Sequence, residues 1–176
     1  MTIDDLNAKE QKRLAAGKPV YRDADQDGVA GVHGYQLIDA PFAEVWATGT
    51  DFASTPRWIE HVGDAEVHPV DGEHIDVTFH IRTPIGIRRN TIRVRGRDNH
   101  KVEFWKVGGA KDMKDVRGLV RARETEGGVV VDARVNADPA VWVPKVVVRI
   151  VIRQVLGEII EGLRREMNRR RLNNAM

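Results

Sequence analysis

The sequence lacks cysteine altogether and has a single serine, Ser54. The first absence excludes disulfide bonds and a thiol nucleophile, and is compatible with a reducing compartment. Ser54 stands at an expected helix start, which argues against an acyl-enzyme serine mechanism. No apolar run reaches the roughly 18 residues of a membrane-spanning helix, and residues 1–14 have no apolar signal core. We therefore expect a cytoplasmic protein.

Neither sign of charge dominates the chain, and aromatic residues are few. The 28 lysines and arginines face 26 aspartates and glutamates, so the composition does not indicate a polycation that binds nucleic acid globally. Aromatic residues make up only 6% of the chain, which leaves mostly short side chains to fill the core. At 176 residues, one domain with a substantial core is expected.

The most informative stretch is the C-terminal run 142–171, which predicts one long helix with Pro144 in its first helical position. Apolar residues recur there at helical spacing and form one stripe: Val148, Ile152, Val155, Leu156, Ile159, Leu163 and Met167. Its first turns are apolar on the other sides too, at Val146, Val147, Ile150 and Val151. Such a helix start is buried or faces an apolar partner.

The remainder of the chain predicts strands, with two short helices near its beginning. Helix starts are expected at residues 39–41 and 55–56, after a first strand at 29–39. Six further strands alternate with turn residues, at about 65–70, 74–83, 87–97, 100–107, 113–124 and 128–136. Short connections predict an antiparallel order. The expected fold class is α+β, with a curved seven-stranded antiparallel sheet wrapped round the long C-terminal helix.

The segment after the first strand resembles the opening of the START-related (SRPBCC) superfamily. Its signature is filled here by Ala40, Pro41, Val45, Trp46, Asp51, Phe52, Pro56 and Trp58. The resemblance covers roughly residues 29–170 and implies the helix-grip fold of birch-pollen-type allergens, steroidogenic acute regulatory-type lipid-transfer domains, polyketide cyclases and coenzyme Q-binding proteins. We divide the chain into an N-terminal helix and hairpin extension, 1–28, and a START-like domain, 29–172.

Short inward residues on a curved sheet predict a cavity between the sheet and the C-terminal helix, which would bind an apolar ligand. The ligand could be a fatty acid, an isoprenoid quinone, a sterol-like terpenoid or a polyketide. A completely filled core is the alternative. The candidate ligand-binding residues are Trp46, Trp58, Val77, Phe79, Ile81, Asn90, Ile92, Val94, Val120, Val131, Val135, Val148, Arg149, Ile152, Val155, Leu156 and Ile159.

Two other functions are weighed against a carrier. Asn90 and Arg149 are the polar residues expected near the cavity, and they are few for a polyketide cyclase or aromatase, so we favour binding over catalysis and name no catalytic residue. A module that binds a ribosome or a membrane would use arginines expected on the outer sheet face: Arg82, Arg89, Arg93, Arg95, Arg117, Arg121 and Arg123. No aromatic platform accompanies them, so nucleic acid is disfavoured. Transient contact with a membrane is an open alternative.

We expect no metal site and no cofactor. Residues 23–28, DADQDG, copy the first half of a calcium-binding loop, but Gly34 stands where the bidentate glutamate belongs, so a hairpin turn is the better interpretation. His74, Asp76 and His80 share one strand face, which is the outer one, and we do not assign a metal to them.

Overall fold

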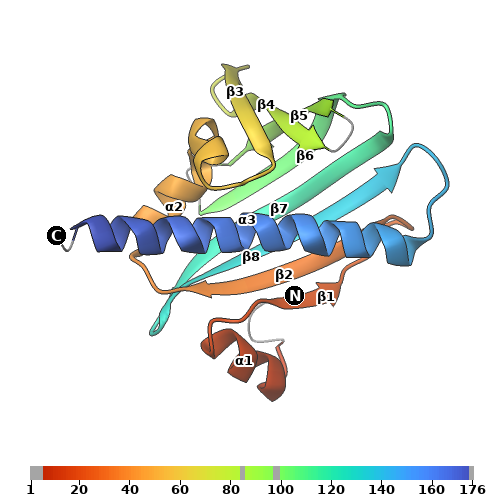
Figure 1. Cartoon of the computed structure of the whole chain (residues 1–176). Coiled ribbons are helices and arrows are strands. Elements are labelled where there is room, and N and C mark those ends of the chain that lie inside the picture. Colours follow the sequence, from red (N-terminus) through yellow and green to blue (C-terminus); the bar gives the residue numbers. More distant parts are fainter. Residues whose placement is uncertain (1–5, 84–85, 97–99, 175–176) are drawn as a thin grey trace.

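The computed structural model describes residues 6–83, 86–96 and 100–174 and shows a curved antiparallel sheet with a long C-terminal helix lying across it (Figure 1). The sheet has eight strands in the order β1-β2-β8-β7-β6-β5-β4-β3. The predicted α+β helix-grip arrangement is confirmed, and the predicted number of seven strands is corrected to eight. The additional strand, β1, belongs to the N-terminal extension and pairs with β2.

The strands alternate with turns much as the period-two pattern predicts. Their bounds are β1 Val20–Asp23, β2 Ala30–Ile38, β3 Val62–Pro69, β4 His74–Thr83, β5 Gly86–Arg95, β6 Lys101–Gly109, β7 Met113–Thr125 and β8 Gly128–Pro139. β3 begins three residues before the predicted position because the chain enters the sheet directly after Ile59, whose carbonyl accepts a hydrogen bond from the Val62 amide. The turn predicted at 23–28 is confirmed, since Gln26 and Val29 bridge there.

Among the described residues there are four helical segments: α1 Ala8–Ala15, α2 Phe42–Thr50, the 3₁₀ helix η2 Phe52–Arg57 and α3 Lys145–Asn174. α1 is fixed by a capping box, in which Asn7 and Glu10 each accept a hydrogen bond from the other's backbone amide. η2 follows α2 after one residue, so the predicted separate start at 55–56 is wrong by about one turn. Pro144 precedes α3, and its carbonyl accepts hydrogen bonds from the amides of Val147 and Val148.

The strand registers define two faces of the sheet. We call the face on the side of α3 the concave face; it carries Val32, Ile38, Val77, Val94 and Val120, which pairing places on the same side. The opposite, outer face carries most of the charged residues. Alternation of this kind in antiparallel strands is the pattern that the sequence predicted.

α3 packs on the concave side of β2 and β8 rather than over the middle of the sheet. Its residues Val148, Ile152 and Leu156 are buried against Val32 and Ala133 in one cluster. Further along, Leu163 and Met167 pack on Ile38, Val45 and Val131. The predicted stripe differs from the structure at two positions: Val155, which it included, is 50% exposed, and Ile160, which it omitted, is fully buried.

A second core lies beyond α3, under α2 and η2. Ile75, Val77, Val94 and Val102 are buried there, and Trp46 and Phe52 pack against them from the helical side. Val120 contacts this cluster and both clusters of α3. It therefore marks the place where the cores meet at the centre of the concave face.

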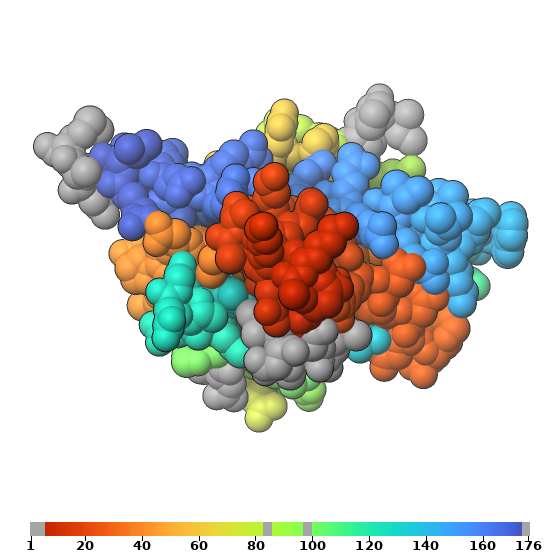
Figure 2. Space-filling view, turned by 90° about the horizontal axis from the view of Figure 1, so that it is seen from below, coloured from red at the N-terminus to blue at the C-terminus, as the bar shows by residue number. Residues whose placement is uncertain are grey.

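The N-terminal extension covers part of the outer face. Leu6 and Leu14 of the α1 region pack on Val20, Tyr35 and Val130, and α1 stands out on the side of the molecule seen in Figure 2. Beside this cluster the buried His33 contacts both the Tyr35 hydroxyl and Asp132, at 3.0 Å each. The contact ties the outer sides of β2 and β8 together.

The outer arginines largely neutralise carboxylates on neighbouring strands. Arg93 pairs with Asp76, and Arg121 and Arg123 both donate to the buried Asp132. Burial by itself would raise the pKa of Asp132, but the hydrogen bond from His33 and the two guanidinium groups outweigh it and lower that pKa below its usual value. A surface of paired arginines offers less free positive charge to a polyanion than the sequence alone indicated.

Candidate ligand-binding site

Apolar side chains at the centre of the concave face are partly exposed, although the centre of a sheet is where burial is normally most complete. Val77 and Val94, which Trp46 and Phe52 cover, are fully buried. By contrast, partial exposure is shared by residues of the central strands and their neighbours: Phe79, Ile92, Phe104, Val116, Val120 and Val135. We call this group the sheet centre. Its exposure shows that no side chain of the described structure covers it completely.

One flank of α3 is apolar and exposed in the same region. Val147, Val151 and Val155 are 43%, 54% and 50% exposed and recur every four residues, so they lie on one side of the helix. The same side carries Glu158, which contacts His61 at 3.0 Å, and Gly162, which lies against Trp58. The flank therefore points away from β1 and toward the half of the molecule formed by η2, β3 and β4. We call these three valines the α3 flank.

Two tryptophans close the region at the C-terminal half of α3. A Cβ on Gly162 would lie 2.4 Å from the Trp58 carbonyl oxygen, so glycine is needed for this close approach. Trp46 packs with Phe42 and with both neighbouring cores. The indole N–H of Trp58 is shielded from solvent and has no acceptor among the described residues. An unsatisfied buried donor is uncommon and marks a place where a ligand oxygen could bind.

Polar groups lie on the concave face of β5 and β6. The Asn90 side-chain oxygen accepts a hydrogen bond from the Ala110 amide at 3.3 Å, which orients the amide group. Arg88, two residues earlier on the same face, pairs with Asp112. Lys106 on β6 stands opposite Ile92 and also faces inward, in alternation with Val102 and Phe104. Of these three residues only Asn90 was predicted, although Arg88 and Lys106 follow the same period-two alternation of their strands.

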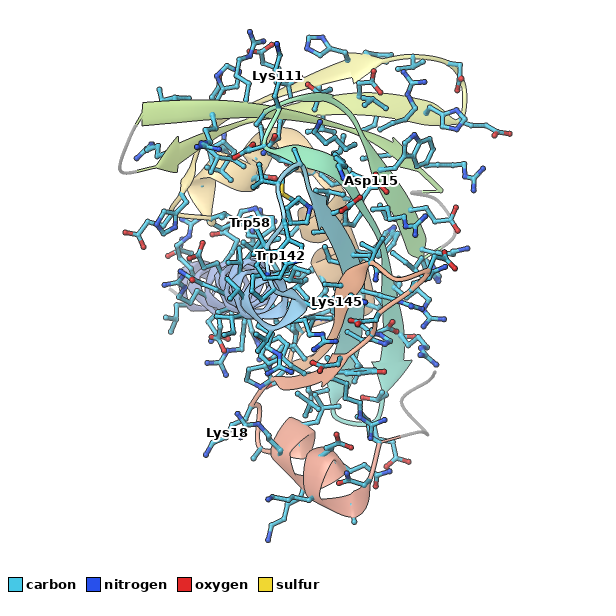
Figure 3. The ribbon with its side chains drawn as sticks, turned by 90° about the vertical axis from the view of Figure 1, so that its right-hand side faces the viewer. Lys18, Trp58, Lys111, Asp115, Trp142 and Lys145 are labelled. Atoms are coloured by element: carbon cyan, nitrogen blue, oxygen red, sulfur yellow. The ribbon has the colours of Figure 1, made fainter. Side chains whose placement is uncertain are left out.

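Near these polar groups the surface forms an open depression of about 490 Å³. It is lined by Arg88, Arg89, Gly109, Ala110, Lys111 and Asp112. The Ala140 amide donates to the Asp112 carbonyl at 2.8 Å, so the loop before α3 lies at the same end of the molecule. Figure 3 looks onto this end, where Lys111, Trp142 and Lys145 are labelled. Trp142 is 88% exposed.

The predicted ligand-binding residues fall into three groups. Residues of the packed cores are buried: Val77, Val94, Val131, Val148, Ile152 and Leu156. Partly exposed or exposed residues lie on or next to the two apolar surfaces: Trp46, Trp58, Phe79, Ile81, Asn90, Ile92, Val120, Val135, Val155 and Ile159. Arg149 forms the third group by itself, because it lies on the opposite side of α3, toward β1.

Arg149 is held by the N-terminal extension. Its Nε and Nη2 donate to the two carboxylate oxygens of Asp25 at 3.0 and 2.6 Å, and Nη1 lies 3.4 Å from Asp23. The hydrogen bond from Arg149, joined by one from the Gly31 amide, lowers the pKa of Asp25 below its ordinary value despite partial burial. The carboxylate that Arg149 binds is therefore supplied by the protein, and the geometry removes this residue from the candidate binding surface.

None of the helices in the described part of the chain combines the length and the apolar composition needed to cross a bilayer.

Comparison with known proteins gives a family and a set of similar folds. The sequence model of the family described as polyketide cyclase / dehydrase and lipid transport matches residues 38–164. A START superfamily protein from Mycobacterium smegmatis has a TM-score of 0.71 at 9% identity, covering 79% of this chain and 97% of that one. Comparison with the curated proteins finds no match.

Two further solved structures have titles that state a role. The STAR-related lipid transfer protein from Xanthomonas axonopodis (fragment 25–204) has a TM-score of 0.69 at 13% identity, covering 85% of this chain and 93% of that one. The ZhuI aromatase/cyclase from Streptomyces sp. R1128 has a TM-score of 0.67 at 13% identity, covering 86% and 96%. At such low identity these similarities show the shared fold.

Proposed function

Since the chain belongs to the polyketide cyclase / dehydrase and lipid transport family of the START superfamily, we propose that it binds a hydrophobic small molecule or lipid between the α3 flank and the sheet centre. The observation that carries the proposal is the partial exposure of apolar side chains on both of these surfaces. Covering them would contribute about 25 cal/mol per Å² before the cost of ordering the ligand.

The polar groups beside this surface support an amphipathic ligand. The free indole N–H of Trp58 offers a hydrogen bond to a carbonyl or hydroxyl group at one end. Asn90, Lys106 and Arg88 line the concave side of β5 and β6 at the other, and they suit a carboxylate or carbonyl. Fatty acids, isoprenoid quinones, sterol-like terpenoids and polyketides all combine a long apolar part with such a group.

Ligand exchange with a membrane is part of this proposal. At the end of the molecule where the loop before α3 lies, apolar residues are strongly exposed: Ile87 is 70%, Val141 69% and Trp142 88% exposed. Lys145 is exposed close to Trp142, and Lys111 is exposed farther along the same end of the molecule (Figure 3). Apolar and aromatic side chains flanked by lysines suit the interface of an anionic bilayer. A carrier needs such a surface in order to collect its cargo.

The first experiment is native mass spectrometry of the purified protein, followed by organic extraction and mass analysis. We expect one hydrophobic molecule per chain, which is lost in the Val155→Trp variant because the indole occupies the α3 flank. Val146→Trp, on the side of α3 facing solvent, is the matched control and should retain the molecule. A protein that co-purifies with nothing and does not bind a fluorescent fatty acid would refute the proposal.

A polyketide cyclase or aromatase is the second candidate, and the convergence of Asn90, Lys106 and Arg88 on one side of the sheet favours it. An amide, an ammonium and a guanidinium could hold a poly-β-ketone chain by its carbonyl oxygens. Catalysis predicts that Lys106→Met abolishes cyclisation of a poly-β-ketone thioester while leaving its binding within a few-fold. A simple carrier predicts no cyclisation by either protein.

A further inference from the structure

A group of metal-binding side chains lies on the outer face of the sheet, opposite the proposed ligand site. Asp64 and Glu66 project from β3, and His80 projects from β4 directly across from Asp64. One ligand atom from each residue lies within 4.8 Å of the other two. An imidazole and two carboxylates at such spacing can converge on a single ion, whose bonds to them would each be about 2.0–2.2 Å.

A β-bulge creates this arrangement. Val62 pairs with Ile81 and Asp64 pairs with His80, so two steps along β3 correspond to one step along β4, with Gly63 as the additional residue. Without the bulge Asp64 would stand opposite Phe79 and face the concave side, because successive strand residues point to opposite faces. The bulge therefore places both acidic residues of β3 on the face that carries His80. Bulges often re-aim side chains at functional positions.

The geometry of His80 is the second observation. Its Nε2 atom lies 2.8 Å from Glu66 Oε1, yet the two atoms do not form a hydrogen bond of acceptable geometry, and Nε2 is shielded from solvent. With this geometry, donation of a hydrogen bond from the imidazole nitrogen to the carboxylate contributes little stabilisation. A cation placed between the nitrogen and the oxygen would satisfy both atoms.

We propose that Asp64, Glu66 and His80 bind a divalent transition-metal cation. One nitrogen and two oxygen ligands suit Zn²⁺ and its first-row neighbours better than Ca²⁺, which takes six to eight oxygen ligands. One oxygen of Asp64 is engaged by the Ala65 amide at 2.9 Å, which fixes the carboxylate and leaves its other oxygen for the ion. Three protein ligands leave coordination positions for water or another molecule.

The proposal replaces the prediction that the chain has no metal site. That prediction considered His74, Asp76 and His80 on one strand, and in the structure the first two are engaged elsewhere: His74 with Asp71 and Asp76 with Arg93. The carboxylates beside His80 come instead from β3. His68 lies at the border of the site, with its Nε2 3.4 Å from the second oxygen of Glu66, and could supply a fourth ligand.

The test is calorimetric titration of the full-length, tag-free protein with Zn²⁺ after removal of metal with a chelator. We expect one ion per chain. His80→Gln and Asp64→Asn should each weaken binding by more than about tenfold, since even indirect partners of metal ligands alter affinity by that much. His74→Gln, which removes a surface histidine paired with Asp71, should change nothing.

A second measurement distinguishes the loss of a metal-binding side chain from a loss of folding. Saturating Zn²⁺ should raise the melting temperature of the wild-type protein and of the His74→Gln variant, but not that of His80→Gln, while all three melt together without metal. Absence of Zn²⁺ binding, or equal binding by wild type and the His80→Gln variant, would overturn the proposal. Because the site lies on the outer face, fatty-acid binding by these variants should be unchanged whichever result is obtained.

Discussion

The double variant Val151→Thr/Val155→Thr tests the proposed ligand surface most directly. These side chains are 54% and 50% exposed in the ligand-free protein, so a ligand that covers them would remove about half of each from water. Complete burial of a valine contributes about 1.5–3 kcal/mol. Half-burial of both valines by the ligand therefore contributes about 1.5–3 kcal/mol to the binding free energy. Most of this contribution is lost when both residues are threonine. The dissociation constant of a fluorescent fatty acid should therefore rise about 10- to 150-fold.

The fold should tolerate this change, because threonine is also β-branched and both positions are already half in water. Val146→Thr/Ile150→Thr is the matched control: it alters residues of equal exposure on a side of α3 that points away from the sheet centre. We expect the control to bind the fatty acid as the wild type does, measured by fluorescence titration with helix content checked by circular dichroism. Equal weakening in both variants, or none in either, would refute the reasoning.

Three further predictions concern stability. Asp132→Asn should lower the free energy of unfolding by about 3 kcal/mol. This is the lower end of the range for a broken buried ion pair, because the arginine partners of Asp132 are about one-third exposed. A loss of less than about 1 kcal/mol in a urea titration would contradict this prediction. Since Asp25 has a lowered pKa, its pair with Arg149 stabilises the fold above the ordinary pKa of 3.8 and is lost as pH falls through the folded value. Arg149→Gln should raise that pKa, measured by carboxyl NMR titration, and flatten the acid limb of stability; an unmoved pKa would show that the pair is absent in solution. Gly118→Ala should lower the free energy of unfolding, measured by urea titration, by about 1–3 kcal/mol. The added Cβ would lie 2.3 Å from Phe104 Cζ and 2.5 Å from a backbone oxygen. An unchanged free energy of unfolding would mean that the Phe104 ring moves freely.

The sequence predicted the fold because local patterns and global packing agree for most of the chain. Alternation in β4 and the helical stripe of Val148, Ile152 and Leu156 correspond to faces that are buried in the structure. β1 spans only Val20–Asp23, and a strand so short is specified by its partner β2 rather than by its own pattern. That is why the eighth strand was missed from the count.

The site was less predictable, since it depends on long-range geometry. The bulge at Gly63 changes which side chains of β3 face outward, and so determines where Asp64 lies. The partner of Arg149 stands 124 positions earlier in the chain, and no local pattern indicates it. Whether an apolar residue is covered, as Ile152 is, or exposed, as Val155 is, depends on where α3 crosses the sheet.

The pairing of β2 with β8 has a consequence for synthesis of the protein. Ala30 lies opposite Ala137, and α3, which is made after β8, covers β2 and β8. During translation β2 therefore lacks its partner β8 until residue 139 has been made, and the concave face stays uncovered until α3 follows. Non-local pairing of this kind slows folding and leaves apolar surface open to aggregation. A nascent chain of this architecture should depend on a chaperone, or on early capture of its own hydrophobic cargo, until the 30 residues of α3 are released.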